Sequence, residues 1–326
     1  MKTKHYLVAI GLSVASAGAM ADLRWTFTTS GLGVSSGATL SSSLQFAGRD
    51  TVSNALSDAN CGVAPAVGCV SVKSYADTVT GGDTVAVPWG GTASQNKLFQ
   101  ANTKVYSGGL GVQWVNPGAN GVLGGTGSNA DTFESTADPE HTMDNCGNYN
   151  ATTGACSTGS NTPEDSLLFS FSDLIALKEI SIGYYRTDAD ITVLAWTGPG
   201  APTVDGKTYA SNDAVGGSSA GLIPSGWTLV GSYANLQDTG MKATITQNTD
   251  AGSANDIKSS YWLIGAYNSR IDNQGWTDNN DFIKLSKLVG AIVTPPQGHA
   301  PEPAALALMA LTLPLLRRRG RAGRGA

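Results

Sequence analysis

Short runs of alternating large apolar and polar residues recur along this chain, which is the pattern of half-buried β-strands. Residues 167–171 place Leu167, Phe169 and Phe171 on one face, and residues 180–184 repeat the alternation. Residues 191–196 are almost continuously apolar, as in a central strand buried on both faces. The same reasoning predicts strands at residues 23–27, 110–114, 227–233, 243–247, 261–267 and 282–289.

Glycine-rich turns separate these runs, for example at residues 81–83, 198–200 and 216–217. About ten to twelve strands with such connections predict an all-β fold, an antiparallel β-sandwich or jelly roll. Residues 29–105 are rich in Ser and Ala and alternate only weakly, so they predict little. A division into two smaller β domains near residue 160 is the alternative, because that region is polar and irregular.

The first 21 residues differ from the rest. Lys2 and Lys4 precede an apolar run at residues 6–19, and Ala19-Met20-Ala21 follows. Charged, apolar and small-residue regions in this order indicate a secretory signal peptide, with a short helix and cleavage before Asp22. A single N-terminal anchor helix is the alternative.

The last 26 residues form a second distinct segment. The uncharged run 304–316 is rich in Ala and Leu, which favours a short hydrophobic helix, and it is 13 residues long. A full membrane span needs ~20 residues, and Pro314 weakens the last turn. A buried terminal helix is the alternative, but an arginine cluster directly behind the run suits a membrane segment better. The residues that flank the run are Pro301, Glu302 and Pro303 before it and Arg317, Arg318 and Arg319 after it.

This ordered ending resembles the PEP-CTERM sorting signal of Gram-negative bacteria, which the membrane transpeptidase exosortase reads. The resemblance implies transient insertion into the inner membrane and cleavage near the Pro-Glu-Pro. The expected organisation is a signal peptide (1–21), a β-sandwich surface domain (22–293), a Pro-rich linker (294–300) and the sorting signal (301–326). Residues 138–145, 167–171, 180–184 and 187–195 also resemble, in this order, a family of exosortase-dependent surface proteins with this ending.

Removal of both terminal segments changes the charge balance. The whole chain has 20 basic and 25 acidic residues, and residues 22–300 keep 13 and 24, a net charge near −11. Such an acidic region argues against nucleic acid or an anionic membrane surface as its partner. The charge is compatible with cation binding or with solubility outside the cell.

All four cysteines lie between the two terminal segments, as the close pairs Cys61 with Cys69 and Cys146 with Cys156. In an exported protein an even number of cysteines indicates disulfides, and local pairing is the simplest choice. Neither pair has the spacing of a zinc site.

Oxygen-bearing side chains suggest a structural calcium ion, since calcium takes six to eight oxygen ligands. The preferred candidates are Asp144, Asn145, Asp188 and Asp190, with Asp138 and Glu140 nearby. Asp272, Asp278 and Asp281 form a second group. Alternatively, these residues simply mark turns, where their side chains bond to neighbouring backbone groups. No other cofactor is expected.

Catalytic chemistry has little support in the sequence. His141 with Asp144 lacks a nucleophile elbow, and Ser225 lies in a turn-like Ile-Pro-Ser-Gly sequence, so we expect no enzyme. Trp89 and Trp276 lie in turn-rich loops and are candidates for carbohydrate binding.

The sequence therefore predicts an exported, exosortase-processed protein of the cell surface or extracellular matrix. Its expected role is structural or adhesive, beside extracellular polysaccharide. A carbohydrate-binding module is the alternative, and a secreted polysaccharide hydrolase is the third possibility.

Overall fold

The computed structural model describes residues 22–28, 40–41, 43–56, 61, 68–76, 85–86, 92–93, 98–113, 142–146, 149–150, 153, 155–156, 164–208, 222–248, 256–277 and 280–293. The chain divides into two units, Met1–Val293 and Thr294–Ala326, and all described residues belong to the first. The expected signal helix and C-terminal hydrophobic helix lie outside the described residues. Within the described part, no helix has the length and apolar character needed to cross a membrane.

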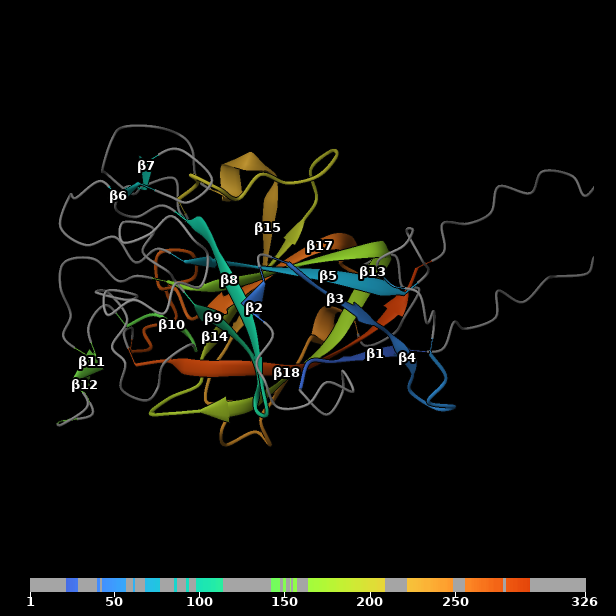
Figure 1. The fold of residues 1–326 in the computed structure, drawn as a ribbon, viewed down its shortest axis with the longest axis horizontal. Coiled ribbons are helices and arrows are strands. Elements are labelled where there is room, and N and C mark those ends of the chain that lie inside the picture. Colours follow the sequence, from blue (N-terminus) through green and yellow to red (C-terminus); the bar gives the residue numbers. More distant parts are fainter. Residues whose placement is uncertain are drawn as a thin grey trace, which may run out of the picture. The chain divides into compact units, whose positions relative to one another are not determined.

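The described protein is mostly β, as the alternation predicted (Figure 1). Its longer strands are β1 (Asp22–Thr26), β3 (Leu44–Ala47), β5 (Cys69–Ala76), β8 (Phe99–Tyr106), β9 (Gly109–Gln113), β13 (Ser166–Tyr185), β14 (Ile191–Trp196), β15 (Trp227–Tyr233), β16 (Lys242–Thr244), β17 (Ser259–Ala266) and β18 (Phe282–Ile292). The two-residue strands are β2 (Leu40–Ser41), β4 (Arg49–Asp50), β6 (Val85–Ala86), β7 (Thr92–Ala93), β10 (Met143–Asp144), β11 (Tyr149–Asn150) and β12 (Ala155–Cys156). Two 3-10 turns, η2 (Ile223–Ser225) and η3 (Thr246–Asn248), complete the elements.

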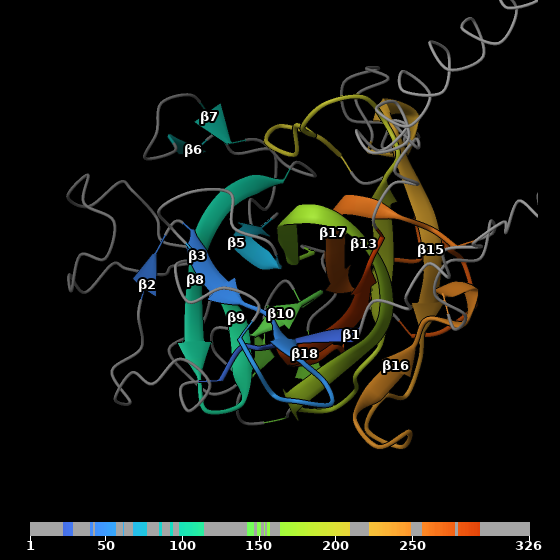
Figure 2. The same ribbon diagram turned by 90° about the vertical axis from the view of Figure 1, so that its right-hand side faces the viewer.

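One 14-stranded antiparallel sheet organises the unit, in the order β15-β14-β17-β13-β5-β8-β9-β18-β1-β4. β13 also pairs with β18, so β13, β5, β8, β9 and β18 close into a ring (Figure 2). Strands from both sides of residue 160 therefore share this sheet, rather than forming separate sheets on each side.

β13 joins the ring to strands β17, β14 and β15 of the sheet. Residues 166–171 pair with β17 and β5, whereas residues 175–185 pair with β18, with irregularities between the two halves. The sequence predicted two strands, at residues 167–171 and 180–184. The structure corrects this to one 20-residue strand.

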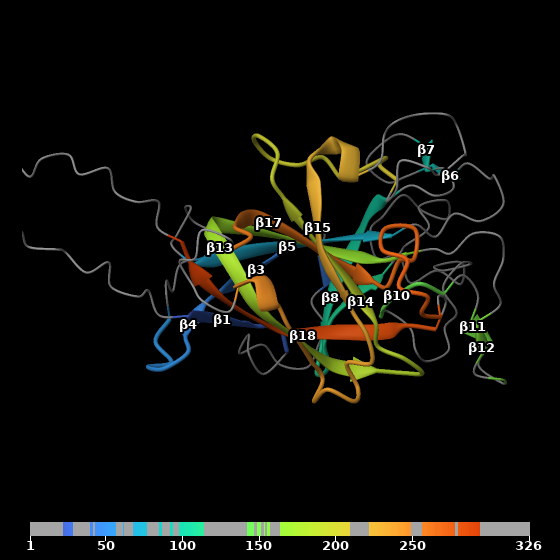
Figure 3. The same cartoon turned by 180° about the vertical axis from the view of Figure 1, so that it is seen from behind.

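Neighbouring residues along β13, β14 and β17 lie in two different hydrophobic cores, because successive side chains of a strand point to opposite faces. Leu167, Phe169 and Phe171 lie in the larger core, as predicted, together with the fully buried Trp25. Leu168 lies in the smaller core, to which β5, β13, β14, β15 and β17 contribute residues. Figure 3 shows β13, β14, β15 and β17 from behind. β14 has buried residues in both cores, which confirms the prediction of a central strand.

Candidate metal centre

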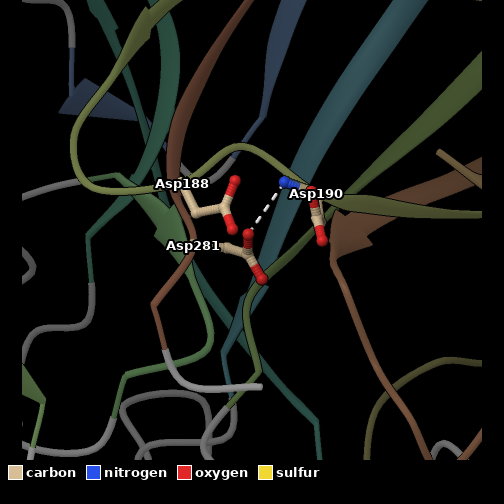
Figure 4. Close-up of side chains that lie close together, drawn as sticks. All are labelled: Asp188, Asp190 and Asp281. Carbon is tan, nitrogen blue, oxygen red and sulfur yellow. Dashed lines mark hydrogen bonds between the residues drawn. The ribbon is translucent and has the colours of Figure 1, made fainter. Parts of the chain in front are cut away.

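Three aspartates meet where β14 and β18 begin. Asp190 directly precedes β14, and Asp281 directly precedes β18 and forms an isolated parallel bridge with Asp188. One carboxylate oxygen from each aspartate lies within 4.8 Å of the others (Figure 4). We call Asp188, Asp190 and Asp281 the carboxylate cluster.

Local backbone geometry brings the cluster together. The chain leaves β13 at Tyr185 and turns through Thr187, which has φ 51°. A β-branched residue rarely adopts this left-handed conformation, so the surrounding contacts must hold it. Two backbone bonds do so on either side of Thr187: the Arg186 N–H donates to Phe282 O (3.0 Å), and the Phe282 N–H donates to Asp188 O (3.4 Å).

Asp281 is the most enclosed member of the cluster, with 0% of its surface exposed. The Asn145 side chain donates from Nδ2 to Asp281 Oδ2 (2.7 Å) and to Tyr267 O (3.0 Å). In return, the Asp281 N–H donates to Asn145 Oδ1 (3.0 Å), and the Asp190 N–H donates to Asp281 Oδ1 (2.8 Å). Asn145, itself buried and directly after β10, thus connects the residue after β17 to the residue before β18.

Amide groups also hold the other two carboxylates. The backbone N–H of Asn235 donates to Asp190 Oδ1 (2.6 Å). Asp188 Oδ1 accepts from the Ala189 N–H and from Gln237 Nε2, both at 2.8 Å. Asp188 Oδ2 accepts from Asn280 Nδ2 at 3.2 Å. The segment after β15 therefore closes over the cluster.

No cationic side chain among the described residues pairs with the carboxylate cluster. The hydrogen-bond donors to these carboxylates within that part of the chain are all amide groups, and no Lys or Arg there forms an ion pair with them. Burial raises the pKa of Asp190 to about 6, against the lowering effect of the Asn235 N–H, and the charge of Asp188 adds to the rise. Burial likewise raises the pKa of Asp281 well above its ordinary value, and the other two aspartates raise it further.

A hard divalent cation suits this donor set. Carboxylate and amide oxygens are the ligands of calcium and magnesium, whereas zinc favours Cys and His. Two further oxygens, Gln237 Oε1 and Asn280 Oδ1, are buried and have no hydrogen-bond partner among the described residues. Both belong to the side chains whose nitrogens hold Asp188, so a small rotation of either amide could offer an oxygen near the cluster.

The residues predicted for calcium separate into three environments. Asp188 and Asp190 lie in the cluster, and Asn145 binds it through Asp281. The Asp144 carboxylate instead accepts from the Cys146 N–H (3.0 Å) and Thr142 Oγ1 (3.2 Å), the local turn role described as the alternative. Asp281 was expected beside Asp272, but Asp272 bonds to Gln274 (2.6 Å).

Three residues that hold the cluster, Asn235, Gln237 and Asn280, were not predicted. Asn280 directly precedes Asp281, and Asn235 has φ 52°, a backbone state that Asn tolerates. Nothing in the sequence distinguishes Gln237. Asp138, Glu140 and Asp278 lie outside the described residues.

Other sequence-predicted sites fall in different places. The Trp276 ring packs on Tyr267, with ring centroids 5.0 Å apart, which leaves Trp276 half-buried. Ser225 lies in η2. Trp89, His141 and the sorting residues 301–303 and 317–319 lie outside the described residues. Cys61 and Cys69 form the expected disulfide. Cys146 is also disulfide-bonded, but the side chain of Cys156 is not among those described.

No known protein family, no curated protein and no solved structure matches this chain.

Proposed function

We propose that this chain is an exported, exosortase-processed protein of the cell surface or extracellular matrix. Its role is structural or adhesive, beside extracellular polysaccharide. The observation that carries the proposal is the ordered ending of Pro301-Glu302-Pro303, an apolar run and an arginine cluster, in a chain that opens with a signal-peptide pattern. The two terminal segments would direct export and sorting, and the β unit would remain as the mature protein.

Three properties of the β unit support this role. Asp22, the first residue expected after signal-peptide cleavage, already lies in the sheet, where β1 pairs it with Ala291 of β18. The Cys61–Cys69 disulfide closes a local loop, which suits an oxidising compartment. The described unit is built almost entirely from one antiparallel sheet with two hydrophobic cores, which is compatible with a β-rich surface domain.

We further propose that calcium binds the carboxylate cluster and stabilises the unit from outside the cell. Three carboxylates within 4.8 Å repel one another, and a bound cation removes that repulsion. Asp188, Asp190 and Asp281 would be its protein ligands. The ion would therefore connect the segments that precede β14 and β18, while amide donors hold the carboxylates in place.

The sorting proposal is tested by mass spectrometry of the mature protein from the cell surface. The expected product begins at Asp22 and ends near Pro301-Glu302-Pro303. A mature C-terminus that extends intact through Arg319 would rule out processing. A glycan array addresses the alternative: selective binding lost in Trp276→Ala or Trp89→Ala would favour a carbohydrate-binding module. Polysaccharide turnover abolished by one Asp or Glu substitution would favour the hydrolase.

The calcium proposal is tested by calorimetric melting of the purified chain with calcium or with EDTA. A ligand at 100-fold its Kd adds about 2.7 kcal/mol, which corresponds to a rise in Tm of about 5–10 °C. Asp188→Asn should abolish the rise and leave the metal-free Tm nearly unchanged, because Asp188 is only half-buried. Asp272→Asn is the matched control and should respond as the wild type does. A wild-type Tm indifferent to both additions would refute the site.

A further inference from the structure

Both ends of the described β unit emerge at the same place. β1 and β18 are antiparallel neighbours, so Asp22 pairs with Ala291. The Val293 N–H donates to Leu174 O (2.8 Å), and the Thr51 N–H donates to Asp22 O (2.9 Å). We call this end, formed by Asp22 and residues 49–56, 172–174 and 291–293, the terminal face; β1 and β4 mark it in Figure 1.

The terminal face exposes an unusual share of aliphatic surface. Five large hydrophobic side chains are exposed in the described chain, and three of them lie here: Val52 (90%), Leu56 (44%) and Leu174 (40%). Isolated exposed apolar residues are common, but their concentration at one end points to a contact.

A fixed turn presents Val52 outward. Asp50 Oδ1 accepts from the N–H groups of Val52 (2.9 Å) and Ser53 (2.6 Å), and Arg49 Nη1 donates to Asn54 O (3.2 Å). Asn54 has φ 59°, which closes the turn. The exposure of Val52 is therefore built into the turn and its hydrogen bonds.

The charge of the terminal face differs from that of the unit as a whole. Among its described residues and their direct side-chain partners, Arg24, Arg49 and Lys178 balance Asp22, Asp50 and Asp173. Each acid is occupied: Asp22 by Lys178, Asp50 by its own turn, and Asp173 by the Gly68 N–H (2.8 Å) and Ser172. The strongly acidic character of residues 22–300 is thus absent from this end, and no net repulsion from an anionic surface is expected here.

The linker that follows this face limits how far it can lie from the apolar run. Ten residues, 294–303, separate Val293 from the apolar run at 304, and they span at most about 35 Å when extended. Four of the ten are prolines, which favour an extended, stiff spacer. β18 has 11 residues and so extends about 35 Å further away from the terminal face.

We propose that the terminal face rests on the lipid surface of the membrane while the apolar run is inserted, with Val52 and Leu56 in the interface. This inference rests on the proposed sorting function and adds an orientation to it. The carboxylate cluster, at the opposite end of β18, then points away from the membrane into the surrounding medium. Cleavage near Pro301 releases the contact, because two exposed aliphatic side chains alone bind a bilayer too weakly to retain the protein.

The test is photo-crosslinking of the precursor that begins at Asp22 and keeps residues 301–326, so that the signal peptide cannot hold it to the vesicles. The vesicles contain phosphatidylethanolamine and phosphatidylglycerol. A benzophenone side chain replaces Val52 in one variant and Tyr185 in the other. Tyr185 is the matched control, because it is 41% exposed and pairs with Ile283 at the other end of β18. Lipid labelling from position 52 should exceed that from position 185 roughly fivefold, the preference expected from about 1 kcal/mol of apolar burial.

Three results would contradict the proposed orientation of the β unit on the membrane. Equal lipid labelling from both positions in a carbonate-resistant precursor would overturn the orientation and leave the sorting proposal standing. A precursor that carbonate extracts from the vesicles would overturn both, since the apolar run would not be inserted. Labelling of protein instead of lipid from position 52 would replace the membrane with a second copy of the chain as the partner of this face.

Discussion

The two ends of β18 differ in what they bury and what they expose: carboxylates are buried at one end, and aliphatic side chains are exposed at the other. At the Phe282 end, Asp190 and Asp281 are 2% and 0% exposed, in contact with no cationic partner among the described residues. At the Ile292 end, apolar Val52 is 90% exposed, while every acid has a partner. Burying an unpaired charge costs free energy of folding, and a bound cation removes that cost. Exposed aliphatic surface is also unfavourable in water, and contact with an apolar partner covers it. The difference suggests two different partners: a cation at the first end and a lipid surface at the second.

The largest expected effect of a single substitution is at Asn145. Asn145→Ala removes both bonds from Nδ2 and leaves the buried Asp281 carboxylate and Tyr267 O short of donors. We expect the free energy of unfolding, measured with urea, to fall by about 3 kcal/mol. Asn54→Gly at the terminal face is the control, because glycine accepts the positive φ while the exposed bond from Arg24 is lost. It should cost about 0.5 kcal/mol, and equal losses for the two variants would remove the contrast between the ends.

The Cys61–Cys69 disulfide comes next and belongs to the terminal end. Trp25 Nε1 donates to Gly68 O (2.7 Å), so the loop is anchored to the larger core directly beside Cys69. Closing a loop between residues 8 positions apart restricts the unfolded chain, and replacing both cysteines by serine should cost about 2–3 kcal/mol. Urea denaturation measures the loss, with thiol alkylation to verify that the wild type is oxidised. An unchanged free energy of unfolding would mean that packing in the larger core stabilises the terminal end without help from the disulfide.

The sequence predicted the strands whose apolar alternation is strong, but it missed β5 and β8. These strands carry Ser74 and Thr103 in the interior, where the two hydroxyls bond to each other at 2.8 Å. From the sequence alone, a buried polar residue whose hydrogen-bond partner lies on a neighbouring strand cannot be distinguished from a residue that faces solvent. The closure of the ring was equally hidden, because the pairing of β13 with β18 depends on the register irregularities in β13.

The candidate site was predictable only where its residues are adjacent. Asp188 and Asp190 flank Ala189 just before a strongly apolar strand, and the sequence places them at one strand end. Asp281 is 91 positions from Asp190, and only the parallel contact between the segments before β14 and β18 brings them together. Gln237 enters from the loop after β15, and no local pattern reveals that contact.

A pH series distinguishes an empty cluster from an occupied one. In EDTA the pKa of Asp190 is about 6 when folded and near its ordinary 3.8 when unfolded, so the folded state binds more protons between these values. Stability should therefore rise as pH falls from 7 to 5, by about 1 kcal/mol, and flatten below pH ~4. With calcium the sign reverses, because protons compete with the ion.

The readout of that series is the difference in Tm between the wild type and Asp190→Asn, which cancels titration elsewhere. Asp281 acts in the same direction, but it is present in both proteins, so most of its contribution cancels in the difference. A difference that stays constant from pH 7 to 5 in EDTA would show that Asp190 does not titrate as a buried acid, and would weaken the case for an uncompensated cluster.

The smallest effect should come from the ion pair at the terminal face, where Lys178 Nζ lies 2.8 Å from Asp22 Oδ1. Both side chains are partly exposed, so Lys178→Met should lower the free energy of unfolding by only about 0.5 kcal/mol in the uncleaved chain. In the mature chain the loss should be smaller still, because cleavage before Asp22 creates an α-ammonium group beside the same carboxylate and that group can replace the lysine. Urea denaturation of both forms measures the two values. A loss above about 1.5 kcal/mol in either form would mean that charge is as poorly solvated here as in the carboxylate cluster, since partly exposed pairs do not reach that value.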